Sequence, residues 1–591
     1  MRHNVIITFN LPSIDVSPYS GLALLGLAAW AGITVSMLRS EKLMTWSQGR
    51  SMVFSQRGIV AAEQPLASEA GATILAQGGS AADAAIATSA VMGVIQPMMN
   101  GMGGDLFAIE WNAKTGKVGG LNASGWSPEG LTLSYLRAKG FRRIPGTGIL
   151  SVSIPGCVMG WWELHQRFGK LPWKDLFKPA IYYASHGFPV PQWDSMYWPT
   201  YADVLAKDAE ATRVYLPGGR PPQLGEVFRN PEYARALELV ASKGQQAFYE
   251  GSIARAIVKT SQELGGVIGA QDLSEYKAEW VQPIETDYRG WKVYEIPPNS
   301  QGVATLEMLN IMGQFPLSSY GALSLERFHI EMQAQQLAYA DLRRYVGDPR
   351  FVKVPVSGML SIEYAETRSK LIDLAKTTCD FQAGSPPGAN TNLAVASPHP
   401  GTDTSYLTSV DRDGNIVSLI QSLAGAFGSG VAVRDYSILL QNRATGFTLK
   451  PGSPGVLAPH KRPFHTIIPA FMERGSIHIG FGIMRGSNQP MAQAQFVSDI
   501  VDYKMNIQQA LEAPRFNKLG RGGCQYLIES RVPKKTLIGL SQTGYHLRVV
   551  GPYAEYVGGG QAVLHDSATG VNYGASDPRK DGEAIPEPSP Q

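Results

Sequence analysis

Residues 403–422, DTSYLTSVDRDGNIVSLIQS, are the stretch of the sequence that decides the fold. Residues 404–410 and 416–420 are rich in apolar and β-branched residues, and an Asp-Gly pair lies between them. Asp-Gly between two such runs indicates a hairpin, because glycine accepts the positive φ that a tight turn requires. We therefore expect two antiparallel strands, the first of which begins at Thr404.

The residues directly before this hairpin have a different composition. Residues 380–403, DFQAGSPPGANTNLAVASPHPGTD, are rich in Pro, Gly, Ser and Asn. Four prolines interrupt any regular structure, so this segment is predicted to be a linker or a mobile loop. The abrupt change from an irregular segment to a strand makes Thr404 the most informative position in the chain.

The overall composition is that of a globular protein with a large core. The chain has 591 residues, of which 44% are hydrophobic and 17% charged, and its length alone suggests several domains or one unusually large fold. Its 64 Gly and 39 Pro favour a layered α/β architecture over a helical bundle. The net charge of +3 is too small for the basic surface that binds nucleic acid, so no nucleic-acid partner is expected.

Several local elements can be placed from patterns alone. Residues 65–77 predict a helix, and Ser80 is the expected N-cap of a second, Ala-rich helix that packs closely against it. The motif NGMGGD at residues 100–105 predicts a glycine turn that leads into a buried strand. Residues 323–345 have helical spacing, and His329 within them is interpreted as a packed helix residue.

Motifs for cofactors and metals are missing from the sequence. It contains no GxGxxG, no GxxxxGK[ST], no GxSxG and no recognisable metal-binding arrangement of histidines, so neither a cofactor nor a metal is expected. The three cysteines, Cys157, Cys379 and Cys524, lie far apart without a CxxC pair. They are interpreted as small buried hydrophobic residues, with a reactive thiol as the alternative.

The N-terminal residues leave the location of the protein open. Residues 20–38, SGLALLGLAAWAGITVSML, carry no charge and reach the lower length limit of a membrane-spanning helix. They can be a signal-anchor, a signal peptide cleaved near residues 29–31, or a leader that does not span the membrane. The flank that follows them is the more basic, which favours a cytosolic main body and conflicts with secretion. The protein is therefore expected to be membrane-anchored, secreted or cytoplasmic.

Seven motifs in one order carry a family resemblance. They are PLASEAGATILAQGGSAADAAIATSAVMGVIQP (65–97), NGMGGD (100–105), the hairpin (403–422), FGSG (427–430), KRPFHTIIPA (461–470), ALEAPRF (510–516) and YGASDPRKDG (573–582). Together they resemble the γ-glutamyltransferase family, also called glutathione hydrolases, from about residue 57 to residue 582.

The resemblance implies a fold and a processing event. The expected fold is an α/β αββα sandwich of the N-terminal-nucleophile hydrolase type, in place of the several domains suggested by length. It also implies an inactive single chain that cuts itself between Asp403 and Thr404. The expected organisation is a leader (1–56) with a possible membrane segment (20–38), a large subunit (57–403) ending in the Pro-rich segment (380–403), and a small catalytic subunit (404–591).

The chemistry of Thr404 supports the same cut. A threonine hydroxyl is a weak nucleophile unless a base lies beside it, and the nearest base is the residue's own α-amine, with a pKa of about 7.7–8.0. This amine exists only after the preceding peptide bond has been cut. Thr404 is therefore expected to be the nucleophile and, through its new amino group, the general base.

Other site residues are assigned by the resemblance. Ser422 matches a hydroxyl residue that hydrogen-bonds the catalytic threonine. The backbone N–H groups of Arg485 and Gly486, in GIMRGSNQP, match an oxyanion hole that the family builds from two glycines, so Arg485 must adopt a backbone conformation that non-glycine residues can reach. His465 and Thr466 stand where the family has a hydroxyl pair bordering the substrate pocket.

Substrate recognition departs from the family pattern. Ser124, Ala424, Arg443 and Gly446 stand where γ-glutamyl enzymes have an Arg, an Asn, a Gln or Glu, and an Asp that hold the glutamyl head group. Arg443 can supply a carboxylate contact from another direction, or it can be a solvated or structural arginine. The expected substrate is therefore a small molecule, either glutathione or one of its conjugates, or, alternatively, a non-γ-glutamyl amide taken by an amidase or acylase. A further alternative is an inactive protein derived from the family.

Overall fold

The computed structural model describes residues 48–395, 403–520 and 522–589. The predicted hairpin is confirmed: β10 (Asp403–Val410) pairs antiparallel with β11 (Ile416–Ala424). Gly414 in the turn has a φ of +85°, which explains why glycine is needed there. The described residues between 381 and 395 contain no helix or strand, as the Pro-rich composition predicted.

Two seven-stranded antiparallel sheets lie at the centre of the fold. The first sheet contains, in spatial order, β19 (Glu583–Pro586), β2 (Ile59–Ala62), β10, β11, β3 (Asp105–Asn112), β4 (Lys117–Ala123) and β7 (Glu279–Val281). The second contains β1 (Val53–Ser55), β18 (Val571–Ser576), β17 (Gly560–Asp566), β13 (Ile477–Ile483), β12 (Ala470–Arg474), β9 (Trp291–Glu295) and β8 (Ile284–Tyr288). The hairpin thus lies in the middle of the first sheet.

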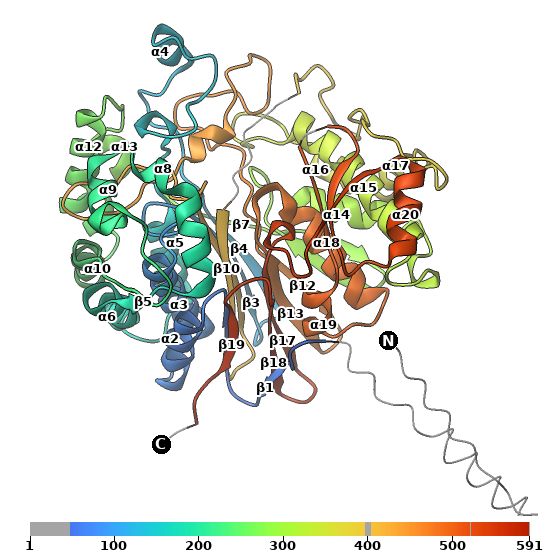
Figure 1. Cartoon of the computed structure of the whole chain (residues 1–591), viewed down its shortest axis with the longest axis horizontal. Helices are drawn as coiled ribbons and strands as arrows, with labels where there is room; N and C mark the ends of the chain where they lie inside the picture. Colours follow the sequence, from blue (N-terminus) through green and yellow to red (C-terminus); the bar gives the residue numbers. More distant parts are fainter. Residues whose placement is uncertain (1–47, 396–402, 521, 590–591) are drawn as a thin grey trace, which may run out of the picture. The chain divides into compact units, whose positions relative to one another are not determined.

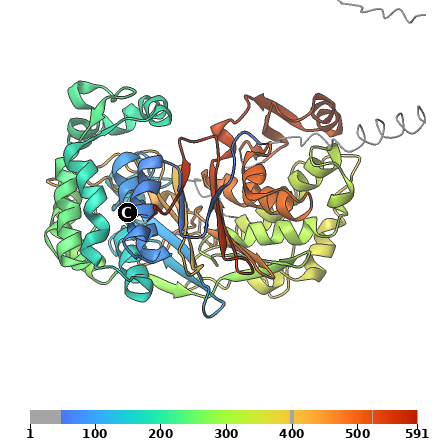
Figure 2. The ribbon, with the colours of Figure 1, turned by 90° about the horizontal axis from the view of Figure 1, so that it is seen from below.

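Helices cover the outer face of each sheet (Figures 1 and 2). The helices over the first sheet include α2 (Pro65–Ala76), α3 (Ala81–Ile95), α5 (Cys157–Phe168), α6 (Lys178–His186) and α10 (Pro231–Lys243). Those over the second include α14 (Gly302–Met312), α15 (Leu325–Tyr345) and α18 (Gln489–Val501). This order of layers confirms the predicted αββα sandwich, in one fold instead of the several domains that length suggested.

A separate hydrophobic core lies between the two sheets. Its members include Phe107 and Tyr406 from the first sheet and Phe471 and Val563 from the second, and all four are buried. Strands covered on both faces read as nearly continuous apolar runs, which explains why the sequence of β3 does not alternate. The core fixes the sheets against each other and holds the start of β10 inside the fold.

The helix pair before the NGMGGD motif has the predicted form. The Ser80 side chain accepts a hydrogen bond from the Asp83 N–H, and the Asp83 carboxylate accepts one from the Ser80 N–H, which is a reciprocal capping box at the start of α3. After the helix, the motif turns into β3. A Cβ on Gly104 would lie 2.5 Å from the carbonyl oxygen of Ser422, so only glycine allows this turn to pass next to β11.

The prediction for α15 is also confirmed. Ser324 caps this helix, and the His329 side chain is buried. Its Nε2 lies 2.9 Å from the carbonyl oxygen of Asp373, and its Nδ1 lies 3.2 Å from the Tyr545 hydroxyl. Burial lowers the pKa of His329, as expected for a packed helix residue.

The fold begins earlier than the sequence suggested. Strand β1 starts at Val53 and pairs with β18, and the exposed Phe54 ring contacts Tyr573 with the ring centres 5.1 Å apart, so the second sheet includes residues that were predicted to belong to the leader. The predicted membrane segment at residues 20–38 lies outside the described residues. Within residues 48–395, 403–520 and 522–589, no helix has both the length and the apolar character that a membrane span requires.

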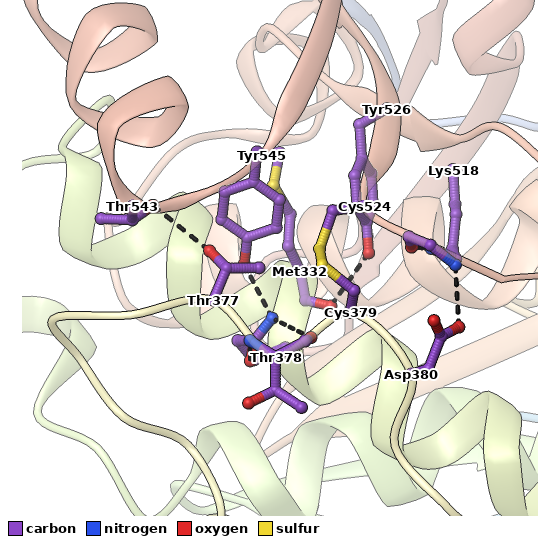
Figure 3. The surroundings of a disulfide bond; sticks show 12 residues. Met332, Thr377, Thr378, Cys379, Asp380, Lys518, Cys524, Tyr526, Thr543 and Tyr545 are labelled. Atoms are coloured by element: carbon purple, nitrogen blue, oxygen red, sulfur yellow. Dashed lines mark hydrogen bonds between the residues drawn. A yellow bond between two sulfur atoms is a disulfide. The ribbon is translucent and has the colours of Figure 1, made fainter.

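The interpretation of the cysteines as three buried hydrophobic residues is wrong for two of them. Cys379 and Cys524 form a disulfide across 145 residues of sequence (Figure 3), whereas Cys157 is free and buried. Next to the bond, the Gly523 N–H donates a hydrogen bond to Asp380 Oδ1 at 2.8 Å. No local pattern indicates this pairing, because Cys379 follows α17 (Ile362–Ser369) and Cys524 precedes β15 (Gln525–Glu529), and the two meet only in the folded chain.

Candidate active site

A bulge in the central hairpin positions Thr404. Asp403 lies opposite Ala424 and Ser405 opposite Gln421, so two residues of β11, Ser422 and Leu423, face the single residue Thr404. The Thr404 side chain is buried, and its Oγ1 donates a hydrogen bond of 2.6 Å to the carbonyl oxygen of Asp403. The hydroxyl of the predicted nucleophile therefore lies against the peptide group that it is predicted to cut.

Ser422 contacts the same carbonyl group. Its Oγ donates a hydrogen bond of 2.6 Å to the Asp403 carbonyl oxygen and accepts one of 2.7 Å from the Ala424 N–H. Two hydroxyl groups thus meet on one carbonyl oxygen. Donors aimed at this atom polarise the carbonyl and stabilise the negative charge that develops on it during nucleophilic attack.

Arg443 lies behind the Ser422 hydroxyl. Its Nη2 donates to Ser422 Oγ at 2.9 Å, its Nη1 donates to Thr466 Oγ1 at 3.0 Å, and its Nε lies 3.9 Å from Asp105 Oδ2. Burial lowers the pKa of Arg443 to about 10, and the nearby Asp105 carboxylate opposes this shift. Both Nη atoms are engaged by hydroxyl groups, so the geometry favours the structural alternative over the predicted contact with a substrate carboxylate.

A buried carboxylate–imidazole pair completes this network. His465 Nε2 lies 2.9 Å from Asp105 Oδ2, while Asp105 Oδ1 accepts hydrogen bonds from the Gly125 N–H and from Gln441 Nε2. Burial and, to a smaller extent, the Arg443 cation lower the pKa of His465 to about 4, against the opposing effect of the Asp105 carboxylate. The imidazole is therefore neutral near pH 7, and its Nε2–H donates to the carboxylate.

The predicted oxyanion-hole residues follow β13. Arg485 has φ +110° and ψ +59°, and Gly486 has φ +51°, so the turn takes the left-handed region at both positions. A non-glycine residue rarely adopts this conformation, which explains why the family has glycine at the first position. Within the described residues, neither N–H group donates a hydrogen bond, so both are available to an oxyanion.

Gln301 connects this turn to the rest of the site. Its Nε2 donates to the carbonyl oxygen of Gly486 at 2.8 Å and to that of Thr466 at 2.5 Å. Thr466 in turn accepts from Arg443. The structure thus brings the predicted residues Thr404, Ser422, Arg443, His465 and Thr466 into one network and links the Arg485–Gly486 turn to it through a side chain that the sequence analysis missed.

Two other contributors were also missed. Asp105 ends the NGMGGD motif and lies opposite Ser422 in the β3–β11 pair, so the motif itself held the available signal. Tyr197, at the end of α7 (Gln192–Tyr197), donates its hydroxyl proton to Asp403 Oδ1, and no local pattern marks it.

The remaining substitutions in the head-group positions carry no charge. Ser124 Oγ donates to Asn122 Oδ1 at 2.7 Å inside a buried network. Gly446 packs so tightly that a Cβ would lie 2.4 Å from the Phe464 carbonyl oxygen, and Ala424 has a φ of +80°. None of these three positions presents a group that could pair with an amino-acid head.

The fold and the buried hydroxyl site at the start of a central strand define the class of N-terminal-nucleophile hydrolases. The sequence matches the γ-glutamyltranspeptidase family over residues 67–587. This match covers most of the chain, and the chain therefore belongs to the γ-glutamyltranspeptidase family.

Individual relatives show the range of this family. The chain is 35% identical over 538 residues to the glutathione hydrolase-like YwrD proenzyme of Bacillus subtilis (strain 168), covering 90% of this chain and 99% of that protein. It is 32% identical over 539 residues to the acylase ACY 1 proenzyme of Pseudomonas sp. (strain SE83), covering 90% and 93%. The crystal structure of a cephalosporin acylase from Bacillus halodurans superimposes with a TM-score of 0.85 at 36% identity, covering 93% of this chain and 99% of that one.

Proposed function

We propose that this chain is a self-processing amide hydrolase that cuts its own Asp403–Thr404 bond and then works through an acyl ester on Thr404. The observation that carries the proposal is the meeting of the Thr404 and Ser422 hydroxyls on the Asp403 carbonyl oxygen. In self-cleavage, Thr404 Oγ1 bonds to the Asp403 carbonyl carbon, the C–N bond breaks, and the nitrogen takes up the hydroxyl proton. Water then hydrolyses the ester and leaves the Asp403 carboxylate and a free Thr404 amine.

Turnover repeats the same chemistry on a substrate amide. The free Thr404 amine accepts the hydroxyl proton as Oγ1 bonds to the substrate carbonyl carbon, and the oxyanion is held by the N–H groups of Arg485 and Gly486. The substrate C–N bond breaks and the proton passes to the leaving amine. Water then releases the acyl group, whereas an amine in place of water makes the enzyme a transferase.

Two acyl donors are candidates. Family membership and the glutathione hydrolase-like relative support the γ-glutamyl group of glutathione or its conjugates. A specific observation favours a non-γ-glutamyl amide, because Ser124 and Gly446 offer no head-group charge and Arg443 is engaged by hydroxyls. The similarity to acylases points the same way.

Intact mass spectrometry of the purified chain, followed by turnover of two chromogenic amides, tests the proposal. We expect a fragment that begins at Thr404, and release of p-nitroaniline from γ-glutamyl-p-nitroanilide or glutaryl-p-nitroanilide. Preference for the first probe supports the glutathione hydrolase and preference for the second supports the acylase. An uncut chain that hydrolyses neither probe contradicts the proposal and supports the inactive alternative, in which the left-handed Arg485 no longer forms a working oxyanion hole.

A further inference from the structure

The Asp403 side chain, on the other side of the predicted cut, is buried among residues that do not belong to the Arg443 network. Asp403 is fully buried, and its Oδ1 accepts the Tyr197 hydroxyl. The Tyr201 hydroxyl lies 3.2 Å from that of Tyr197. Tyrosine hydroxyls therefore face the carboxylate of the residue whose carbonyl carbon is attacked in self-cleavage.

A buried lysine that has no acceptor within the described part of the chain lies close enough to Asp403 to feel its charge. Lys580 is 4% exposed, and its Nζ lies 3.2 Å from the centre of the Trp193 ring, which in turn stacks on Tyr197 at 4.3 Å. Among the described residues, this Nζ has no hydrogen-bond partner. The aromatic face offers part of the missing solvation, but a buried ammonium that lacks an acceptor is costly and indicates a group that pairs with an anion.

The charges around this lysine include the Asp403 carboxylate. Burial lowers the pKa of Lys580, while the carboxylates of Glu63, Glu555 and Asp403 oppose this shift. Arg485 Nη1 lies 3.0 Å from Glu555 Oε2. Burial lowers the pKa of Arg485, but the carboxylates of Glu555 and Asp403 outweigh this effect and hold the pKa above its usual value. The carboxylates of Asp403 and Glu555 thus both lie near the Lys580 and Arg485 cations. Of these two residues, Asp403 is the one at which self-cleavage would create a new chain end.

Thr404 would carry two different esters, one during self-cleavage and one during turnover, and comparing them indicates which substrate groups would lie near Tyr197 and Lys580. In self-cleavage the acyl group on Thr404 is an aspartyl group, whose carboxylate is separated from the ester carbonyl by two carbons. In turnover the acyl group on the same oxygen belongs to the substrate. A substrate acyl group with a carboxylate at the same spacing can therefore reach the same Tyr197 hydroxyl, and its charge can satisfy the Lys580 ammonium that Asp403 leaves without an acceptor.

We propose that Tyr197, Lys580 and Arg485 form an anion subsite for the free carboxylate of the substrate's acyl group. Before cleavage, Tyr197 binds the Asp403 carboxylate there, while Lys580 and Arg485 act on it through their charges without a hydrogen bond to it. The substrate class is an amide of a short dicarboxylic acid, with succinyl as the nearest match to the aspartyl group. This inference rests on the proposed acyl-Thr404 ester. It assigns the acyl carboxylate to residues other than Arg443.

The test compares two amides of equal carbon number on the self-cleaved wild-type enzyme. Succinyl-p-nitroanilide carries the carboxylate and butyryl-p-nitroanilide does not. A charge-assisted contact in a buried site predicts that kcat/KM for the succinyl probe exceeds that for the butyryl probe about 10- to 100-fold. Lys580→Met should bring this ratio close to one, and Lys580→Arg should retain most of it.

Lys518→Met is the matched control. Lys518 is also partly buried over an aromatic ring, 4.7 Å from the centre of Tyr526, but it lies beside the disulfide, and its Nζ donates to the Gly523 carbonyl oxygen. This variant should leave the ratio of the two probes unchanged. If Lys580→Met fails to self-cleave, inhibition of the wild-type enzyme by succinamate, which carries the carboxylate, and by butyramide, which does not, replaces it, with succinamate expected to bind at least about 10-fold more tightly.

The outcomes separate this inference from the proposed function. Equal turnover of both probes by the wild-type enzyme, or an unchanged ratio in a self-cleaved Lys580→Met, overturns the anion subsite and leaves the acyl-Thr404 mechanism intact. Equal inhibition by succinamate and butyramide also overturns the anion subsite. An uncut wild-type chain that hydrolyses neither probe overturns the proposed function and the subsite together.

Discussion

Two cationic clusters flank the Asp403–Thr404 bond, and they differ in how their donors are used. On the threonine side, both Nη atoms of Arg443 bind hydroxyl groups within a network that reaches Asp105. On the aspartate side, the ammonium of Lys580 is buried without an acceptor among the described residues. Hydroxyl groups hold both Nη atoms of Arg443 in place, and its Nε lies 3.9 Å from the Asp105 carboxylate, whereas an ammonium with no acceptor gains free energy when an anion arrives. We infer that the Arg443 cluster orients the catalytic hydroxyl groups and that the Lys580 cluster binds an anion.

Removing the nucleophile gives the largest expected effect. Thr404→Ala should fold normally, remain uncut and lose at least about 10⁴-fold in activity, while Thr404→Ser should be cut slowly. Intact mass and a denaturing gel with reductant measure the cut. Thr408→Ala is the control, because this hydroxyl of the same strand donates to the Val417 carbonyl oxygen, away from the cut. Normal processing of Thr404→Ala would remove Thr404 from the mechanism.

Replacing Ser422 tests the role of one hydroxyl group in the Arg443 cluster, the one that donates to the Asp403 carbonyl oxygen. Ser422→Ala removes a donor from the Asp403 carbonyl oxygen and should slow self-cleavage by about 10²–10³-fold. It also leaves the Ala424 N–H and an Arg443 Nη without their acceptor. The time course of fragment formation measures the rate, and Ser422→Thr, which keeps the hydroxyl, should recover most of it. An unchanged rate in the alanine variant would show that polarisation of this carbonyl does not limit the cut.

Replacing Arg443 distinguishes a residue that orients the Ser422 and Thr466 hydroxyl groups from one that binds a substrate carboxylate. Arg443→Lys cannot make both Nη contacts. If these contacts orient the hydroxyl groups, kcat should fall about 10- to 100-fold while KM stays within about twofold. Steady-state kinetics on the cleaved enzyme separate the two constants. A rise in KM with kcat unchanged would favour the contact with a substrate carboxylate that the sequence suggested.

The smallest expected effect is the contribution of His465 to the pH dependence of the free energy of unfolding. Because His465 has a pKa of about 4 in the folded chain and about 6.5 when unfolded, the unfolded chain binds more protons between these values. Its contribution to stability is therefore complete above about pH 6.5 and is lost as the pH falls, reaching about 2 kcal/mol of loss at pH 5.

Chemical denaturation at pH 7.5 and pH 5 of the wild type and of His465→Gln measures this contribution. The variant should lose less stability than the wild type between the two pH values, and comparing the two cancels the other titrating groups. Identical pH dependence in both proteins would mean that the imidazole is not held neutral by the fold.

The sequence revealed the parts of the molecule that local patterns determine. The central hairpin, α2, α3 and β3 follow from turn residues, caps and apolar runs, and the start of β10 next to Thr404 follows from the change of composition before it. The contacts that define the site join distant residues: Asp105 and His465 are 360 positions apart. Such pairs arise only when strands from both parts of the chain are packed together, so no local pattern could predict them.

The departures from the family were visible in the sequence but could not be interpreted there. Arg443 was recognised as a remaining cation, yet its role depends on which groups its two Nη atoms face, and only packing decides this. The same is true of Lys580, which lies in a motif that the sequence analysis used for the resemblance alone. Lys580 of the YGASDPRKDG motif is a candidate specificity determinant because the fold buries it.

The disulfide between Cys379 and Cys524 changes what cleavage would produce. One cysteine precedes the predicted cut and the other follows it, so the two polypeptides would remain a single covalent molecule after the peptide bond is gone. Without reductant, a denaturing gel would hide the maturation of this protein, and dilution could not separate the subunits. In an oxidising compartment the bond would persist and act as a permanent tether, whereas in a reducing one only the packed layers would hold the subunits together.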